Sequence, residues 1–296
     1  MRFYIKLLFF IFLLYSCSEI EDIDIVNTDE NDNNTTNQER KIKTILKDNN
    51  YDLSRFYVGT AINTNQLNTN AENLFLDEFT YSTPENCAKQ SIVHPEPDIW
   101  NWTRLESYLS FAEKNNINIR IHGPISPQSS KWAKNDSRTK DELLNNMEEF
   151  LYSLSQKINN SPSVKWMDVV NETITTSGEW FLDKPGDENW ENPWTKIGFN
   201  TDGVPIYIER AFHIADSLAP NVNLVYNQHG GMEKVMWDKV KETIIYLKNK
   251  GYRVNGLGWQ AHLKDWKILS LNRDKLNFLS ELIDWTHNNN MEFHIT

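Results

Sequence analysis

Cysteine is nearly absent from this sequence, which has two in 296 residues, Cys17 and Cys87. We expect Cys17 to be lipidated, as argued below, so no second cysteine is left to form a disulfide with Cys87. No histidine can be paired with Cys87 from the sequence, and we interpret it as a packed thiol rather than a nucleophile. Metal-binding spacings such as His-Glu-x-x-His or paired cysteines are also missing, so the sequence implies neither a metal nor another cofactor.

Basic residues are outnumbered, since 30 Lys and Arg stand against 41 Asp and Glu and the formal net charge is −11. Residues 1–32 contribute much of this excess with seven acidic and two basic side chains, which leaves 34 acidic and 28 basic side chains elsewhere. No basic cluster occurs on which a nucleic acid could bind, so nucleic-acid partners are excluded. We expect a monomer.

Long hydrophobic runs are missing except at the N-terminus, where Arg2 and Lys6 precede an apolar stretch over residues 7–14. The stretch is too short to cross a bilayer, which needs roughly 20 apolar residues. Its layout is typical of a cleaved export signal, and Leu14-Tyr15-Ser16-Cys17 resembles a bacterial lipobox. We expect residues 1–17 to be a lipoprotein signal peptide whose Cys17 anchors the protein in the membrane, at the outer membrane or cell surface. A buried N-terminal strand or helix is disfavoured, because nothing after it continues a packing pattern.

Aromatic residues are absent from residues 18–40, which are acidic at first and then rich in Asn and Thr. Such a composition cannot build a core and is typical of a disordered tether. The acidic residues directly after Cys17 resemble a surface-export signal of some Gram-negative lipoproteins, although a merely solvated linker explains them equally well.

From residue 41 onward, short apolar runs alternate with amphipathic helical stretches, which predicts an α/β fold with a parallel sheet. A doubly wound open sheet should have a Gly-rich turn after its first strand, but Phe56 to Thr60 contains one glycine. Thr103 and Glu106 predict a helical capping box. The expected strands cover residues 56–60, 78–82, 117–122, 164–170, 223–227, 254–259 and 291–296.

Polar residues gather where these strands end, and (β/α)₈ barrels place their chemistry at the carboxyl ends of the strands. We therefore predict that residues 41–296 form one TIM (β/α)₈ barrel domain, incomplete because about seven strands can be counted. The polar strand ends are Thr83 to Asn86, Arg120 to His122, Val169 to Glu172, Tyr226 to His229, Gly256 to His262 and Phe293 to Thr296.

These strand ends resemble those of glycoside hydrolase family 10, the retaining endo-1,4-β-xylanase family, from about Phe56 to Thr296. The resemblance implies an endo-acting enzyme that cleaves β-1,4-xylosidic bonds of xylan by double displacement, with Glu172 as the general acid/base. The substrate-binding residues that it implies are Glu85, Asn86 and Lys89 in a Glu-Asn-x-x-Lys pattern, His122, Asn171, Gln260 and His262. We expect Asp168 to be a buried, hydrogen-bonded acid rather than a catalytic one.

The family's catalytic nucleophile is a glutamate directly after the motif that ends here in Ile295-Thr296. We therefore expect this chain to be a fragment of a longer enzyme and to hydrolyse no xylan above background by itself. In the family the equivalent of His262 holds that nucleophile, so we expect His262 to have no partner within the chain.

The sequence departs from the family pattern after the third strand, where Ser126 and Pro127 replace a Trp-His pair, although Gln128 can be aligned. Gln228 and His229 replace an acidic segment, and we assign them a structural or subsite role. Trp180, Trp190 and Trp194 in the loop after Glu172 either stack on sugar rings or anchor the loop. Two alternative functions stay open, namely a non-catalytic glycan-binding surface lipoprotein and a hydrolase of another β-linked polysaccharide.

Overall fold

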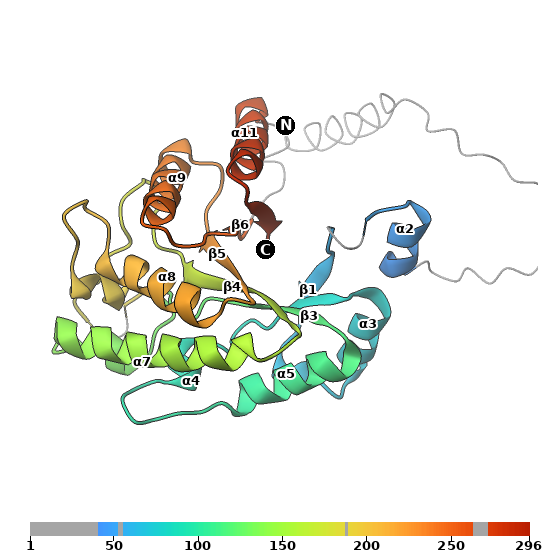
Figure 1. Ribbon diagram of the computed structural model, residues 1–296, viewed down its shortest axis with the longest axis horizontal. Coiled ribbons are helices and arrows are strands. Elements are labelled where there is room, and N and C mark those ends of the chain that lie inside the picture. The colour runs from blue at the N-terminus through green and yellow to red at the C-terminus, as the bar shows by residue number, and fades with distance from the viewer. Residues whose placement is uncertain (1–40, 53–55, 187–188, 263–271) are drawn as a thin grey trace, which may run out of the picture. The chain divides into compact units, whose positions relative to one another are not determined.

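The computed structural model describes residues 41–52, 56–186, 189–262 and 272–296 (Figure 1). The expectations for residues 1–40, namely the signal peptide, the lipidated Cys17 and the tether, lie outside these residues. Within the described residues, no helix is long and apolar enough to cross a membrane.

A single curled sheet of seven parallel strands forms the centre of the described domain. Each strand pairs with the next one in the sequence, so the strand order is the chain order and the crossover connections carry the helices. The strands are β1 (Gly59–Ala61), β2 (Tyr81–Thr83), β3 (Asn118–Ile121), β4 (Val164–Asn171), β5 (Asn223–Gln228), β6 (Gly256–Trp259) and β7 (Glu292–Ile295). This confirms the predicted incomplete TIM barrel, a half-barrel in which β1 and β7 are the edges of the described sheet.

Helices cover the outer side of the sheet, and α7 and α8 run side by side along it (Figure 1). The helices are α2 (Ile42–Asp48), α3 (Asn70–Glu78), α4 (Gln90–Val93), α5 (Thr103–Asn115), α6 (Lys131–Lys134), α7 (Lys140–Asn159), α8 (Ile206–Leu218), α9 (Lys234–Asn249) and α11 (Arg273–Asn288). Two short 3₁₀ helices, η1 (Thr64–Gln66) and η2 (Pro193–Ile197), lie in connecting loops.

Helix α7 shows how the sequence specifies these elements. Thr139 and Glu142 form a reciprocal capping box at its start, which satisfies backbone N–H groups that the helix leaves unpaired. Apolar residues then recur every three or four positions, and Leu143, Met147 and Phe150 are fully buried against the core. Each such side chain contributes about 1.5–3 kcal/mol of burial free energy, so packing rather than helix propensity stabilises α7.

Two details of the sequence-based prediction are wrong. The strand expected over residues 78–82 starts too early, because Glu78 is the last residue of α3 and β2 begins at Tyr81. The capping box of Thr103 and Glu106 does not form, because the Glu106 carboxylate instead accepts a hydrogen bond from Lys157 Nζ at 2.6 Å. The Thr103 N–H is bonded by Asn101 Oδ1 at 3.2 Å.

The inner side of the sheet holds a large charged side chain, and a glycine makes room for it. Arg120 of β3 is fully buried and reaches β6 at Gly258. A Cβ atom on Gly258 would lie 2.5 Å from Arg120 Nη2 and would also overlap Asn227 Oδ1. The glycine at this position of β6 is therefore a packing requirement of the barrel interior.

Candidate active site

The carboxyl ends of β3 to β7 bring the polar residues singled out from the sequence to one rim of the half-barrel, since all strands are parallel. Asn171 is the last residue of β4 and is buried, and Glu172 follows it half-buried. Glu172 has a φ of +58°, a left-handed conformation that costs a non-glycine residue free energy and recurs at functional sites. Its N–H donates to the carbonyl of Asn227 at 3.2 Å, which fixes this conformation.

Gln260 ties the two β4 residues together. Its Nε2 donates to Asn171 Oδ1 at 2.7 Å and to Glu172 Oε1 at 3.0 Å. Asn227 Nδ2 donates to the same Asn171 oxygen at 2.8 Å. The side chain of Gln260 is buried, so the carboxylate of Glu172 is aimed by a neutral donor of fixed position.

His262 does have a partner within the chain, contrary to expectation. Its Nε2 lies 2.8 Å from Gln260 Oε1, at hydrogen-bond distance. The residue between them, Ala261, has a φ of +48°, so the chain turns sharply at the end of β6 and brings the two side chains together. The alternation of side chains along a strand does not account for this turn, because β6 ends at Trp259.

A buried ionic layer lies directly beneath. Asp168 Oδ1 accepts from Arg120 Nε at 2.7 Å, and Asp168 Oδ2 lies 2.8 Å from His122 Nδ1. Burial alone would raise the pKa of Asp168, but the charge of Arg120 and the hydrogen bonds of both partners lower it below its ordinary value. Asp168 is thus the hydrogen-bonded structural acid that the sequence predicted, and it fixes the ring of His122 at the rim.

Lys89 closes the rim on the side of β2. Its ammonium donates to Asn86 Oδ1 at 2.8 Å and to Gln128 Oε1, and the side chain is buried. Burial lowers the pKa of Lys89, while the carboxylates of Glu85 and Glu172 oppose that shift. Lys89 is therefore within electrostatic range of the candidate acid/base residue.

Glu85 and Cys87, on either side of Asn86, differ in environment. Glu85 is exposed and accepts from Asn63 Nδ2 at 2.7 Å, so its carboxylate is held at the surface of the same rim. Cys87 is buried, and burial raises the pKa of its thiol to about 12. The burial of Cys87 and the raised pKa of its thiol both agree with the predicted packed thiol.

Gln228 and His229 have separate roles that the sequence did not resolve. Gln228 is fully buried and its Oε1 accepts from the N–H of Thr173 at 3.1 Å, so it secures the loop that follows Glu172. Burial lowers the pKa of His229, and the charge of Glu172 opposes the shift, so this imidazole lies close to the candidate acid/base. Within the described part of the chain, the buried Nδ1 of His229 has no hydrogen-bond partner.

The three tryptophans of the β4–α8 loop are also distinguished by the structure. Trp194 is fully buried and its Nε1 donates to the carbonyl of Ser126 at 3.3 Å. Trp180 donates to the carbonyl of Gly203 at 3.1 Å beneath the ammonium of Lys239. Both anchor the loop, although Trp180 stays partly exposed. Trp190 is 49% exposed and has the most surface of the three for stacking on a sugar.

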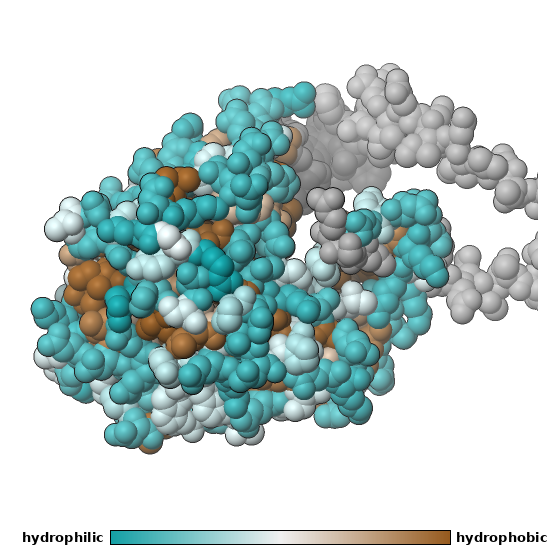
Figure 2. Space-filling view, in the orientation of Figure 1, coloured by the Kyte–Doolittle hydropathy of each residue, from teal (hydrophilic) through white to brown (hydrophobic). Residues whose placement is uncertain are grey.

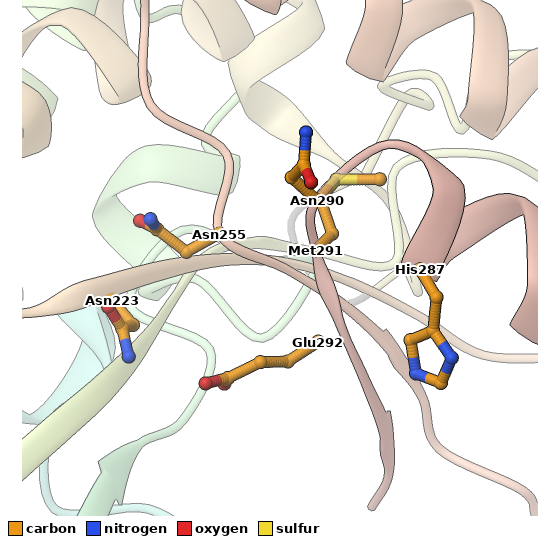
Figure 3. A pocket seen from close by; sticks show the side chains of 6 residues that line it. All are labelled: Asn223, Asn255, His287, Asn290, Met291 and Glu292. Atoms are coloured by element: carbon orange, nitrogen blue, oxygen red, sulfur yellow. The ribbon is translucent and has the colours of Figure 1, made fainter.

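A pocket at the other end of the sheet is not part of this arrangement. Figure 3 shows this depression of about 540 Å³ at the amino ends of β5 and β7, where Asn223 and Glu292 begin these strands. Asn255 in its wall accepts a hydrogen bond from the N–H of Leu224 at 2.9 Å and so joins neighbouring strands. In TIM barrels this end supports stability, so the chemistry belongs to the opposite rim.

A half-buried carboxyl group aimed by an amide, with an asparagine, a lysine and a histidine around it, defines a site that can bind hydroxyl groups and transfer a proton. Parallel (β/α) strands with such a rim are typical of glycoside hydrolases. The model of the family described as "Glycosyl hydrolase family 10" matches residues 46–296, and the chain belongs to this family.

Named relatives are xylanases. The chain is 28% identical over 215 residues to endo-1,4-beta-xylanase A of Xylanibacter ruminicola. The matched region covers 70% of this chain and 54% of that protein. It is 28% identical over 230 residues to a beta-1,4-xylanase of Dictyoglomus thermophilum, which covers 77% of this chain and 60% of that protein. The chain thus spans somewhat more than half the length of these two curated relatives.

Solved structures agree with the fold. Xylanase 10B of Thermotoga maritima has a TM-score of 0.66 at 27% identity, over 87% of this chain and 73% of that one. Xylanase B of Clostridium stercorarium has a TM-score of 0.69 at 20% identity, over 86% of this chain and 72% of that one, and shows the fold alone.

Proposed function

We propose that the rim residues around Glu172 form the acid/base half of a retaining endo-1,4-β-xylanase site, with Glu172 as the general acid/base and xylan as the substrate. The observation that carries the proposal is the pair of hydrogen bonds from Gln260 Nε2 to Asn171 and Glu172. They hold a carboxyl group and a neighbouring amide in fixed positions at one strand end, which supports roles for them in proton transfer and sugar binding.

In the first step, the nucleophilic glutamate that the family pattern has directly after the Ile295-Thr296 motif attacks the anomeric carbon. Glu172 donates its proton to the glycosidic oxygen as the bond to the leaving sugar breaks, which leaves a covalent glycosyl-enzyme intermediate. In the second step, the resulting carboxylate takes a proton from the water that attacks the covalent intermediate. Asn171 is positioned beside Glu172 to bind the sugar 2-hydroxyl, where hydrogen bonds strengthen in the transition state. The same rim carries Lys89, Asn86 and His122, which bind the sugar on the non-reducing side of the cleaved bond.

The nucleophile of a retaining site lies about 5–5.5 Å from the acid/base carboxyl group. The family pattern places it directly after Thr296, at the carboxyl end of β7. The position of Thr296 supports this, because its Oγ1 donates to Asn227 Oδ1 at 3.3 Å and Asn227 in turn binds Asn171. A residue that follows Thr296 would therefore enter the rim next to the network that holds Glu172.

A different β-linked polysaccharide is the second candidate substrate, and the loop after β3 favours it. Ser126 and Pro127 are buried, and Ser126 Oγ accepts from the N–H of Gln128 at 3.2 Å. This loop therefore offers the sugar neither of the two aromatic rings that the family pattern has there. The loss of these two rings supports a backbone sugar other than xylose.

Export with a lipid anchor at Cys17 remains a proposal that rests on the order of charged, apolar and lipobox residues over 1–17. Palmitate labelling of cells that produce the wild-type protein and Cys17→Ala tests it. Label on the wild type alone is expected, and equal label on both would contradict the anchor.

The function is tested on the product of the open reading frame that contains these residues, with Glu172→Gln as the variant and Glu179→Gln as the matched control. Glu179 is an exposed glutamate in the same loop. We expect Glu172→Gln to lose about 10²–10⁴-fold in xylan hydrolysis, the usual contribution of a general acid, and the control to lose nothing. Proton NMR of the first product should show the β-anomer. Equal activity of both variants would refute the role of Glu172, and higher activity on a β-glucan or a β-mannan than on xylan would favour the second substrate.

A further inference from the structure

A groove of about 680 Å³ lies on the outer surface of the domain, between α7, α8 and the loop that joins α4 to α5. It is formed by helix residues and not by the strand ends, so it is separate from the rim that carries Glu172. Its volume falls within the range of about 300–1,000 Å³ that ligand sites occupy. Figure 2 shows that the face carrying α7 and α8 mixes hydrophobic and hydrophilic side chains.

We propose that this groove is a second binding site for the neutral polysaccharide that the enzyme cleaves. The proposal rests on the proposed function, because it takes the same β-linked polymer as its ligand. We call it the α7–α8 groove. Its wall includes Trp100, Tyr152, Asp98, Glu149 and Arg210.

Exposed aromatic side chains are the first reason. Trp100 is 38% exposed and Tyr152 is 52% exposed, and both line the α7–α8 groove. Trp100 stacks nearly parallel to His94 at 3.8 Å and to Trp102 at 5.4 Å, so its orientation is fixed before any ligand arrives. Rigid aromatic surface binds the apolar C–H groups of a sugar at little cost in conformational entropy.

The hydrogen-bonding groups are the second reason. Carboxylates of Asp98 and Glu149 and the guanidinium of Arg210 line the same groove, and Arg210 is held by Glu148 at 2.6 Å. Hydroxyl groups of a sugar can donate to the former and accept from the latter. His94 is fully buried and its Nδ1 lies 2.9 Å from the carbonyl oxygen of Ile99. Its Nε2 lies 3.7 Å from Glu149 Oε2 and has no hydrogen-bond partner among the described residues.

The charge of the groove selects the class of ligand. Its carboxylates, from Asp98, Glu148 and Glu149, outnumber its one guanidinium, that of Arg210. The resulting negative potential disfavours nucleic acids and other polyanions. Aromatic surface with uncompensated carboxylates matches an uncharged, hydroxyl-rich chain.

A second site on the same domain as the catalytic rim acts through effective concentration. A polymer that is bound at the α7–α8 groove stays near the rim between cleavage events, and its apparent affinity rises without any new contact at Glu172. A tetrasaccharide cannot engage both places at once. The effect should therefore depend on substrate length.

The test compares the full-length protein carrying Glu172→Gln, which holds xylan without cleaving it, with the same protein carrying Trp100→Ala and Tyr152→Ala in addition. Leu74→Ala in the same background is the control, because Leu74 is 63% exposed on α3 and lies outside the groove. Retention in affinity electrophoresis on soluble xylan and binding of xylotetraose by calorimetry are measured. Tyr152→Ala alone provides a second variant, since removing an exposed side chain from α7 leaves the core intact.

We expect retention on xylan to weaken at least fivefold in the double variant and at least twofold in Tyr152→Ala. Binding of xylotetraose and the retention of Leu74→Ala should not change. Unchanged retention in both groove variants would overturn the proposal, and so would an equal loss for xylotetraose. Sedimentation that shows a dimer lost in the variants would assign the groove to self-association instead. If the protein without Glu172→Gln hydrolyses no xylan, the proposed function fails, while retention still decides whether the groove binds it.

Discussion

Replacing Gly258 by alanine should destabilise the protein far more than the same change at Gly256, two residues earlier on the same strand. At Gly258 the new Cβ would lie 2.5 Å from Arg120 Nη2 and overlap Asn227 Oδ1. At Gly256 the nearest atoms are His294 Nε2 and Val225 Cγ2, both at 3.2 Å. A shift of a few tenths of an ångström relieves the second crowding but not the first.

The magnitude follows from what must move. Arg120 is fully buried and ion-paired to Asp168 on its other side, so it cannot retreat without losing hydrogen bonds. Overpacking costs about 1–3 kcal/mol, and losing the 3.1 Å bond from Arg120 to Asn227 costs about 1.5–3 kcal/mol as a charged hydrogen bond. Alanine in a strand returns about 0.5–1 kcal/mol of backbone entropy. The net expectation is a loss of about 2–5 kcal/mol for Gly258→Ala.

Urea denaturation followed by tryptophan fluorescence measures both variants against the wild type. Gly256→Ala should stay within about 1 kcal/mol of the wild type. The reasoning is refuted if the two variants lose similar stability, because the difference between them depends only on the contacts of Arg120 and Asn227.

Three further predictions concern the ionic core and one helix end. Asp168→Asn should lower the free energy of unfolding by about 3–5 kcal/mol, because Arg120 keeps its buried charge without a counter-ion. The pKa of Asp168 is lowered in the folded protein, so in the wild type this stabilisation holds above about pH 4 and is lost as the pH falls through the folded-state pKa. Urea titrations at several pH values measure both effects. Arg253→Ala should cost about 2–3 kcal/mol in thermal unfolding, since Arg253 donates to Asp216 and to three carbonyls after α8, and Arg253→Lys should rescue little of it. Burial lowers the pKa of His294 despite the opposing charge of Glu292, so the unfolded chain binds a proton more readily than the folded protein. The free energy of unfolding should therefore fall as the pH drops below about 6.5. His294→Gln should make this dependence on pH weaker, and an unchanged dependence would contradict the prediction.

The alternation of apolar runs and helical stretches was enough to predict seven parallel strands, and the polar residues at the strand ends were needed to predict an incomplete barrel rather than an open sheet. Strand limits were less accurate where a helix runs into a strand, as at Glu78, because local sequence carries no signal for the residue at which the chain turns. The capping box of Thr103 failed for a related reason. Lys157, which is distant in sequence, competes for the Glu106 carboxylate, and only the packed structure brings it there.

At the rim, the resemblance of the strand ends to family 10 singled out Asn171, Glu172 and Gln260, but not how they are connected. The left-handed turn at Ala261 lets His262 bond Gln260, and no pattern of residue types specifies that turn. The proximity of His229 to Glu172 was missed as well, although its place at the end of β5 was a signal in the sequence. Trp194 could not be distinguished from Trp190 before the structure placed the first in the core and the second in solvent.

Asn227 connects the buried ionic layer to the rim that carries Glu172. Its Oδ1 accepts from Arg120 of the ionic layer and from Thr296 of β7, and its Nδ2 donates to Asn171 at the rim. The position of Glu172, the proposed acid/base residue, therefore depends on the packing of the barrel interior, and a change at Gly258 should disturb sugar binding as well as stability. The α7–α8 groove has no such link through Asn227, so changes there should alter retention on the polymer while the stability of the core and the rim stays the same.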